Sequence, residues 1–142
     1  MKLQPLPCYC ATLRQAARAA TVFYEQVLSD TGIRPTQFTV LQALDVAPNL
    51  TTTDLADAIG IDQTTATRAL SLLRQNRLAK NTVGKDRRER RWTLTADGET
   101  TLRRLMPKWE AAQASFEKQI GRDAALNIRR SAYRVAHTLA TE

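Results

Sequence analysis

The spacing of apolar residues predicts long helices at both ends of the chain. Between residues 10 and 30, apolar side chains recur every three or four residues, which is typical of an amphipathic helix; they are Leu13, Ala16, Ala17, Ala20, Phe23, Tyr24 and Val27. Similar patterns cover residues 95–121 and 123–139. Pro107 lies inside the first of these two segments and is expected to bend that helix.

The middle of the chain predicts shorter elements. Pro35 fits the first turn of a helix. Thr51 and Asp54 have the spacing of a capping box, with Thr51 as N-cap and Asp54 reaching back. Asp62 is placed to cap the following helix by accepting a backbone N–H. Two short helices joined by a tight glycine-containing turn form a helix-turn-helix pattern.

Residues 78–83 and 90–95 are predicted to pair as two short strands after these helices. A helix-turn-helix followed by a two-stranded hairpin constitutes a winged helix. The predicted fold class is therefore mostly α with a small β-hairpin wing. The first and last helices are amphipathic beyond what this small module could cover, so we expect them to bury their apolar faces against a partner.

Length and composition suit one folded domain. The chain has 142 residues, of which 43% are hydrophobic, and this argues against a disordered chain. No apolar run approaches the ~20 residues of a membrane span, and no secretion signal is visible. The expected location is the cytoplasm.

The positive charge is concentrated in one window. Residues 68–91 contain nine basic and two acidic residues, so they carry 9 − 2 = +7, which equals the net charge of the chain. The remainder holds 12 basic and 12 acidic residues and is neutral. A polyanion-binding surface needs such localised charge, so we expect double-stranded DNA as a partner.

The second short helix is expected to read bases in the major groove, where base edges carry a distinguishable code. Its outward polar side chains are Gln63, Thr64, Thr67, Arg68, Ser71 and Arg74, the last two meeting phosphates. The hairpin tip is expected to enter the minor groove, with Lys85, Asp86, Arg87, Arg88 and Arg90 as candidates. Asp86 is predicted to orient the Arg88 guanidinium through a charge-assisted pair.

These residues resemble the MarR family of bacterial transcriptional regulators from about residue 10 to residue 139. The most specific parts are Asp86-Arg87-Arg88 and Leu94-Thr95-Ala96-Asp97-Gly98. Residues 61–68, Pro107 and Trp109 also match, whereas Gly84 stands where many relatives carry an acidic residue. The resemblance implies a homodimer of single-domain chains 1–142, with residues 10–30 and 97–140 as dimerisation helices and residues 35–96 as the winged helix-turn-helix.

The implied function is sequence-specific transcriptional regulation. Family members typically repress a promoter from a pseudo-palindromic operator, and release DNA on binding a small, often aromatic, acid or on thiol oxidation. Candidate liners of a ligand pocket between the dimer helices and the winged helix are Arg18, Tyr24, Phe38 and Trp109. Each of these residues could equally be plain core or a surface group.

A redox sensor is an alternative signal-receiving site. Cys10 and Tyr24 have a spacing that resembles the organic-hydroperoxide-sensing branch, in which the tyrosine hydrogen-bonds the thiolate. Arg14 stands where that branch has another tyrosine, and it could favour the thiolate instead. Cys8 lies two residues before Cys10, and Cys10 could also be a small apolar interface residue.

Other function classes fit less well. With His137 as the sole histidine, Cys8 and Cys10 cannot complete a tetrahedral metal site, so no metal or cofactor is expected. No catalytic triad or phosphate-binding glycine loop is visible, so an enzyme is not expected. A sequence-indifferent architectural DNA-binding protein would show affinity that changes little between sequences.

Overall fold

The computed structural model describes residues 2–140. It confirms the mostly helical fold with a small hairpin. The elements, in chain order, are α1 (Tyr9–Val27), α2 (Pro35–Val46), β1 (Leu50–Thr51), α3 (Thr52–Ile59), α4 (Gln63–Gln75), β2 (Ala79–Val83), β3 (Arg90–Leu94), α5 (Ala96–Ile120) and α6 (Arg122–Ala140).

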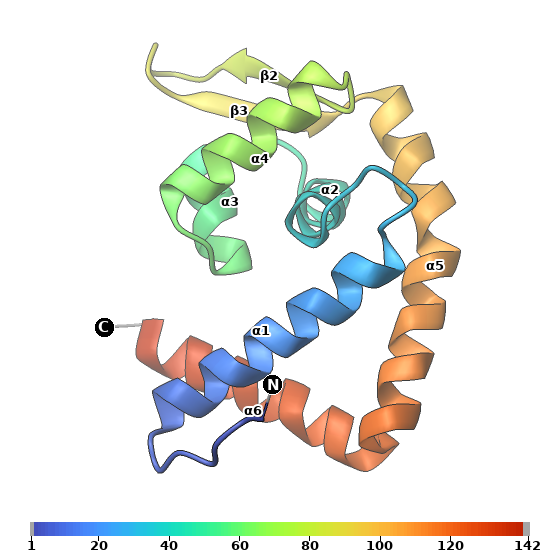
Figure 1. Cartoon of the computed structure of the whole chain (residues 1–142). Coiled ribbons are helices and arrows are strands. Elements are labelled where there is room, and N and C mark those ends of the chain that lie inside the picture. Colours follow the sequence, from blue (N-terminus) through green and yellow to red (C-terminus); the bar gives the residue numbers. More distant parts are fainter. Residues whose placement is uncertain (1, 141–142) are drawn as a thin grey trace.

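The elements form two regions joined by α5 (Figure 1). Helices α2, α3 and α4 lie beside the sheet at one end of the molecule, while α1 and α6 lie at the other end. Helix α5 runs continuously from one region to the other with Pro107 inside it. The bend expected at Pro107 stays a prediction.

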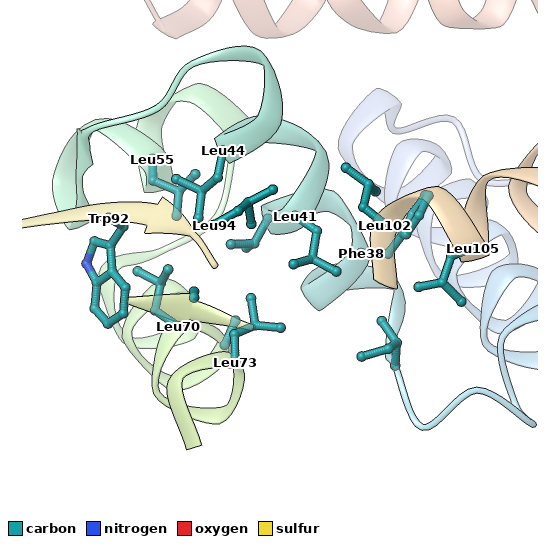
Figure 2. Packing of buried hydrophobic residues seen from close by; sticks show 14 of the residues in the cluster. Phe38, Leu41, Leu44, Leu55, Leu70, Leu73, Trp92, Leu94, Leu102 and Leu105 are labelled. Carbon is teal, nitrogen blue, oxygen red and sulfur yellow. The ribbon is translucent and has the colours of Figure 1, made fainter. Parts of the chain in front are cut away.

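The hydrophobic core lies in the region with the sheet. Figure 2 shows that α2, α4, β3 and α5 all contribute side chains to one cluster. Its labelled members are Phe38, Leu41, Leu44, Leu55, Leu70, Leu73, Trp92, Leu94, Leu102 and Leu105. Burying each large apolar side chain contributes about 1.5–3 kcal/mol relative to exposure. The winged helix therefore folds around its own core within one chain.

A third strand extends the predicted hairpin. Strand β1 pairs antiparallel with β3, placing Leu50 opposite Trp92 and Thr51 opposite Arg91, so the order is β1-β3-β2. Asn49 enters this strand in the left-handed conformation, with φ of 68°. Two residues are too few to show strand periodicity, which is why the sequence pattern did not reveal β1.

The junction between the wing and α5 requires a glycine. Thr95 caps α5, since its Oγ1 accepts the Gly98 N–H at 2.9 Å. A Cβ built on Gly98 would overlap the carbonyl oxygen of Leu78. The start of α5 can therefore pack against Leu78, directly before β2, only with glycine at position 98.

The two end helices contribute little to this core. Helix α1 has no buried residue, and in α6 Ala125 alone is buried. Among residues 2–140, no helix is both long and apolar enough to cross a membrane.

Candidate nucleic-acid interface

The predicted caps of α3 and α4 fix where the two short helices begin. Thr51 Oγ1 accepts the Asp54 N–H at 3.0 Å, which confirms Thr51 as N-cap. The Asp54 carboxylate makes no return bond to Thr51 among the described residues, so that half of the capping box was wrong. Asp62 Oδ1 accepts the Thr65 N–H at 2.7 Å, and its Oδ2 accepts the Thr65 hydroxyl at 3.0 Å. These bonds lower the pKa of the Asp62 carboxyl.

Helix α4 separates an apolar face from a polar one. Ala66, Ala69, Leu70 and Leu73 are buried. The candidate base- and phosphate-contacting residues Gln63, Thr64, Thr67, Arg68 and Arg74 are exposed, whereas Ser71 is half-buried. The outer face of α4 is therefore free to meet DNA, although the role of each residue stays a prediction.

The wing tip differs from the sequence prediction at Asp86. Its Oδ1 accepts the backbone N–H of Arg88 at 3.1 Å, and its carbonyl oxygen accepts the Glu89 N–H at 2.9 Å. Within the described chain the Asp86 carboxylate forms no ion pair with the Arg88 guanidinium, so the predicted charge-assisted pair was wrong. An aspartate two residues before an amide readily closes a local turn instead. Asp86 thus shapes the backbone that presents Arg88.

The basic residues of the wing fall into two groups. Lys85, Arg87 and Arg88 are exposed, and Arg90 is exposed while its Nη1 donates to the Arg87 carbonyl oxygen at 3.0 Å. Arg91 is different, because its guanidinium is engaged by Glu89 and by the chain at Asn49.

A hollow of about 450 Å³ unites the wing with the helix-turn-helix. It is lined by Thr51, Thr52, Thr53, Gln63, Thr67, Asp86, Arg88, Glu89 and Arg90. The N-terminus of α3 opens into it, and helix N-termini favour negative charge. Sequence reasoning had not placed Thr52 and Thr53 at the interface, although the run of threonines at the start of a helix was visible.

The candidate redox residues do not form one site within a chain. Cys8 and Cys10 are exposed, and Arg14 Nη2 donates to Cys10 Sγ at 3.4 Å. Tyr24 lies fourteen residues further along the same helix, about 21 Å away at 1.5 Å per residue, so it cannot reach Cys10 of its own chain. Its hydroxyl donates to Gln113 Oε1 of α5, and burial raises the pKa of the Tyr24 phenol.

The four predicted ligand-pocket residues do not line one cavity. Phe38 is buried in the core, and its ring lies 6.5 Å from that of Trp109, which packs against the same cluster. Arg18 is exposed on α1. Tyr24 lines a cavity of about 200 Å³ between α1, α5 and α6. Phe38 and Trp109 therefore belong to the core. The sequence could not show this, because an aromatic residue at helical spacing fits a core position as well as a pocket.

A different cavity reaches α4. It measures about 190 Å³ and lies between α1, the start of α2, and α4. Its lining includes Glu25, Arg34, Gln37, Arg68 and Leu72. Across residues 2–140, no group of three or more histidine, cysteine or acidic side chains is placed to hold a metal ion.

Comparisons with known proteins agree with this geometry. The sequence profile described as MarR family matches residues 31–89. The transcriptional regulator MosR of M. tuberculosis, solved in complex with DNA, is 31% identical with a TM-score of 0.81, covering 94% of this chain and 97% of MosR. No curated protein gave a significant match.

Two further solved structures share the fold. PcaV from Streptomyces coelicolor, solved with its natural ligand, is 23% identical with a TM-score of 0.80, covering 96% of this chain and 98% of PcaV. BpsR of Bordetella bronchiseptica, whose DNA binding is regulated by 6-hydroxynicotinic acid, is 22% identical with a TM-score of 0.81, covering 96% and 99%. The chain belongs to the MarR family and is a DNA-binding transcriptional regulator, not an enzyme.

The Asp62 cap makes the stability of the chain pH-dependent. Because its pKa is lower in the folded chain, its contribution is present above the ordinary carboxyl pKa of about 3.9 and is lost as pH falls through the folded value. Asp62→Asn keeps a capping oxygen but cannot titrate. In urea unfolding from about pH 6 to about pH 3, wild type should lose stability relative to Asp62→Asn. A difference that does not change with pH would contradict this role.

Proposed function

We propose that this regulator is a homodimeric repressor that binds a pseudo-palindromic operator in the cytoplasm and is released by a small aromatic or organic acid. The observation that carries the DNA-binding geometry is the hollow shared by the wing, the start of α3 and the outer face of α4. Arginine, glutamine and threonine side chains line it beside the carboxylates of Asp86 and Glu89. The arginine, amide and hydroxyl groups are of the kinds that contact phosphates and base edges.

Each half of the interface has its own role in this proposal. Gln63, Thr64, Thr67 and Arg68 read bases in the major groove from α4, while Ser71 and Arg74 meet phosphates. Lys85, Arg87, Arg88 and Arg90 reach the neighbouring minor groove from the wing. MosR, which has been solved with DNA, supports this placement by its similarity.

The exposed apolar residues of the end helices support a homodimer. In a single chain, many large apolar side chains of α1, α6 and the segments next to them are exposed; they are Leu3, Leu6, Tyr9, Leu13, Val22, Ile120, Ile128, Tyr133, Val135 and Leu139. An exposed apolar surface of this kind marks an interaction site. Residues 10–30 and 97–140 therefore serve as dimerisation helices, and residues 35–96 as the DNA-binding region.

A second chain also explains the operator symmetry. Two identical winged helices related by a two-fold axis read two half-sites about one helical turn apart.

The cavity between α1, α2 and α4 is the proposed effector site. Arg34 and Arg68 supply two positive charges against the single negative charge of Glu25, and Leu72 and Pro35 supply apolar surface. This combination fits a small organic acid, because a carboxylate can pair with an arginine. Because Arg68 also lies on the outward face of α4, a carboxylate bound to it would compete with DNA. Two structural neighbours support a small-molecule effector: PcaV was solved with its natural ligand, and the DNA binding of BpsR is regulated by 6-hydroxynicotinic acid.

Arg88→Ala tests the DNA interface. Loss of a groove-inserted guanidinium should weaken operator binding by about 1–3 kcal/mol, or about five- to 150-fold in Kd. The measurement is fluorescence anisotropy with a duplex recovered by selection from a randomised library. Lys2→Gln, which removes one exposed positive charge outside the dimerisation and DNA-binding segments, is the control. Equal affinity of Arg88→Ala and wild type would remove Arg88 from the interface.

Leu139→Asp tests the dimer. Leu139 is 69% exposed in the single chain, so an aspartate there should leave the chain folded. At a dimer interface the same aspartate would be an unpaired buried charge, and the dimer should dissociate. Sedimentation velocity measures the change. The control is Lys80→Gln on β2, which also lowers the net charge by one but lies outside both dimerisation segments. A fully dimeric Leu139→Asp protein would place Leu139 outside the interface.

A thiol switch is the second candidate function. The observation that favours it is the exposure of Cys10, whose Sγ accepts a hydrogen bond from Arg14 at 3.4 Å. Reactive cysteines lie in accessible surroundings beside basic side chains. Cys8, two residues before Cys10 in the chain, is a second exposed thiol.

Cys10→Ser tests this switch directly. If Cys10 senses oxidants, an organic hydroperoxide should release wild-type protein from its operator and leave the Cys10→Ser complex intact. DNA release is followed by anisotropy, with dithiothreitol added afterwards to restore binding in wild type. Equal release of both proteins would end the thiol-sensor hypothesis.

A further inference from the structure

Arg91 is the one basic residue of the hairpin segment 84–91 whose guanidinium is held by two partners from different parts of the described chain. Its Nη2 donates to Glu89 Oε1 at 2.8 Å within the wing. Its Nη1 donates to the carbonyl oxygen of Asn49 at 3.0 Å, 42 residues away in sequence. The fork of the guanidinium therefore joins the wing to the turn that leads into β1.

Glu89 is held in place by the backbone of Gly84. The Gly84 N–H donates to the Glu89 carbonyl oxygen at 3.0 Å. A Cβ built on Gly84 would overlap the Glu89 carboxylate and would lie only 2.7 Å from its Cδ. The glycine therefore leaves room for Glu89 to lie across the hairpin and reach Arg91.

The other end of this contact leads directly to the helix-turn-helix. Asn49 precedes β1, in which Thr51 pairs with Arg91 and caps α3. The neighbouring Trp92 is buried, and its Nε1 donates to Thr52 Oγ1 at 2.9 Å. Asn49, one partner of Arg91, is thus connected through β1 to α3. Glu89, the other partner, lies in the wing.

We propose that Arg91, held by Glu89 over Gly84, is a positioning residue that sets the angle of the wing relative to the helix-turn-helix. It acts through Arg87 and Arg88 and does not itself contact phosphate. This inference rests on the proposed DNA-binding function. It assigns DNA contact to Arg87 and Arg88 and a positioning role to Arg91. The acidic Glu89 is then a required part of a surface that otherwise binds a polyanion.

This role makes predictions that differ in sign from simple electrostatics. Removing a carboxylate near DNA should strengthen binding if charge alone mattered. If Glu89 holds Arg91, Glu89→Ala should instead weaken operator binding by about three- to tenfold, the effect of losing hydrogen bonds that fix a geometry. Gly84→Ala, which changes no charge, should weaken binding similarly by displacing the Glu89 side chain.

The salt dependence of binding separates positioning from phosphate contact. Losing a phosphate contact lowers the slope of log K against log salt by about one. Arg91→Gln and Arg91→Lys should both weaken binding by about three- to tenfold with an unchanged slope, because lysine lacks the fork that joins Glu89 to Asn49. Arg87→Gln, which loses the same charge at the exposed tip, should lower the slope.

The experiment titrates each variant with the selected duplex at several salt concentrations. Lys2→Gln, which removes one exposed positive charge outside the dimerisation and DNA-binding segments, is the control. Thermal unfolding verifies that each variant is folded. The double variant Gly84→Ala/Glu89→Ala should bind as Glu89→Ala does, because the added methyl no longer meets a carboxylate. Gly84→Ala and Arg91→Lys perturb the Glu89–Arg91 contact independently. If one of the variants fails to fold, the other still tests the positioning role of Arg91.

The outcomes also separate this inference from the function on which it rests. Wild-type affinity in Arg91→Lys, or tighter binding by Glu89→Ala, would overturn the positioning role while leaving DNA binding intact. A wild-type protein that selects no duplex from the library would overturn the proposed function and the positioning role together.

Discussion

The burial of Trp92 in the central strand is the constraint on which the rest of the winged helix depends. Trp92 is 6% exposed and lies in the core, and its indole N–H donates to Thr52 at the start of α3. Because β3 pairs with β1 on one side and β2 on the other, one side chain fixes the sheet against the helix-turn-helix. The wing therefore continues from β3, and the direction of β3 determines where its basic tip points.

The distribution of charge follows from this arrangement. The window 68–91 carries the net charge of the chain, but its members lie in different environments. Arg88 lines the hollow, Arg91 is held at the base of the wing, and Asp86 and Glu89 bond to the hairpin itself. The two acidic residues, Asp86 and Glu89, therefore order the loop that carries the basic side chains. A count of charges along the sequence cannot distinguish this role from one in which the acidic residues only reduce the positive charge.

The sequence predicted those features that depend on local chemistry. The caps at Thr51 and Asp62 and the inner face of α4 were predicted correctly, because side-chain spacing and helix geometry decide them. The two-residue β1, the Asp86 contact and the separation of Phe38 from a pocket were missed. All three depend on how the chain folds in space. The pairing of β1 with β3 joins residues about 40 apart in sequence. Asp86 could accept from either the Arg88 backbone N–H or its guanidinium, and Phe38 could line either the core or a pocket.

The position of Arg68 joins the two activities that the chain is proposed to have. It lies on the outward face of α4 and also lines the cavity between α1, α2 and α4. If DNA and an organic acid compete for this guanidinium, each must weaken the other by the same factor, because coupling between binding sites is reciprocal. Helix α1, which closes that cavity, has no buried residue of its own in the single chain. A partner that packs on α1 would therefore set the shape of the effector site as well as the spacing of the two winged helices.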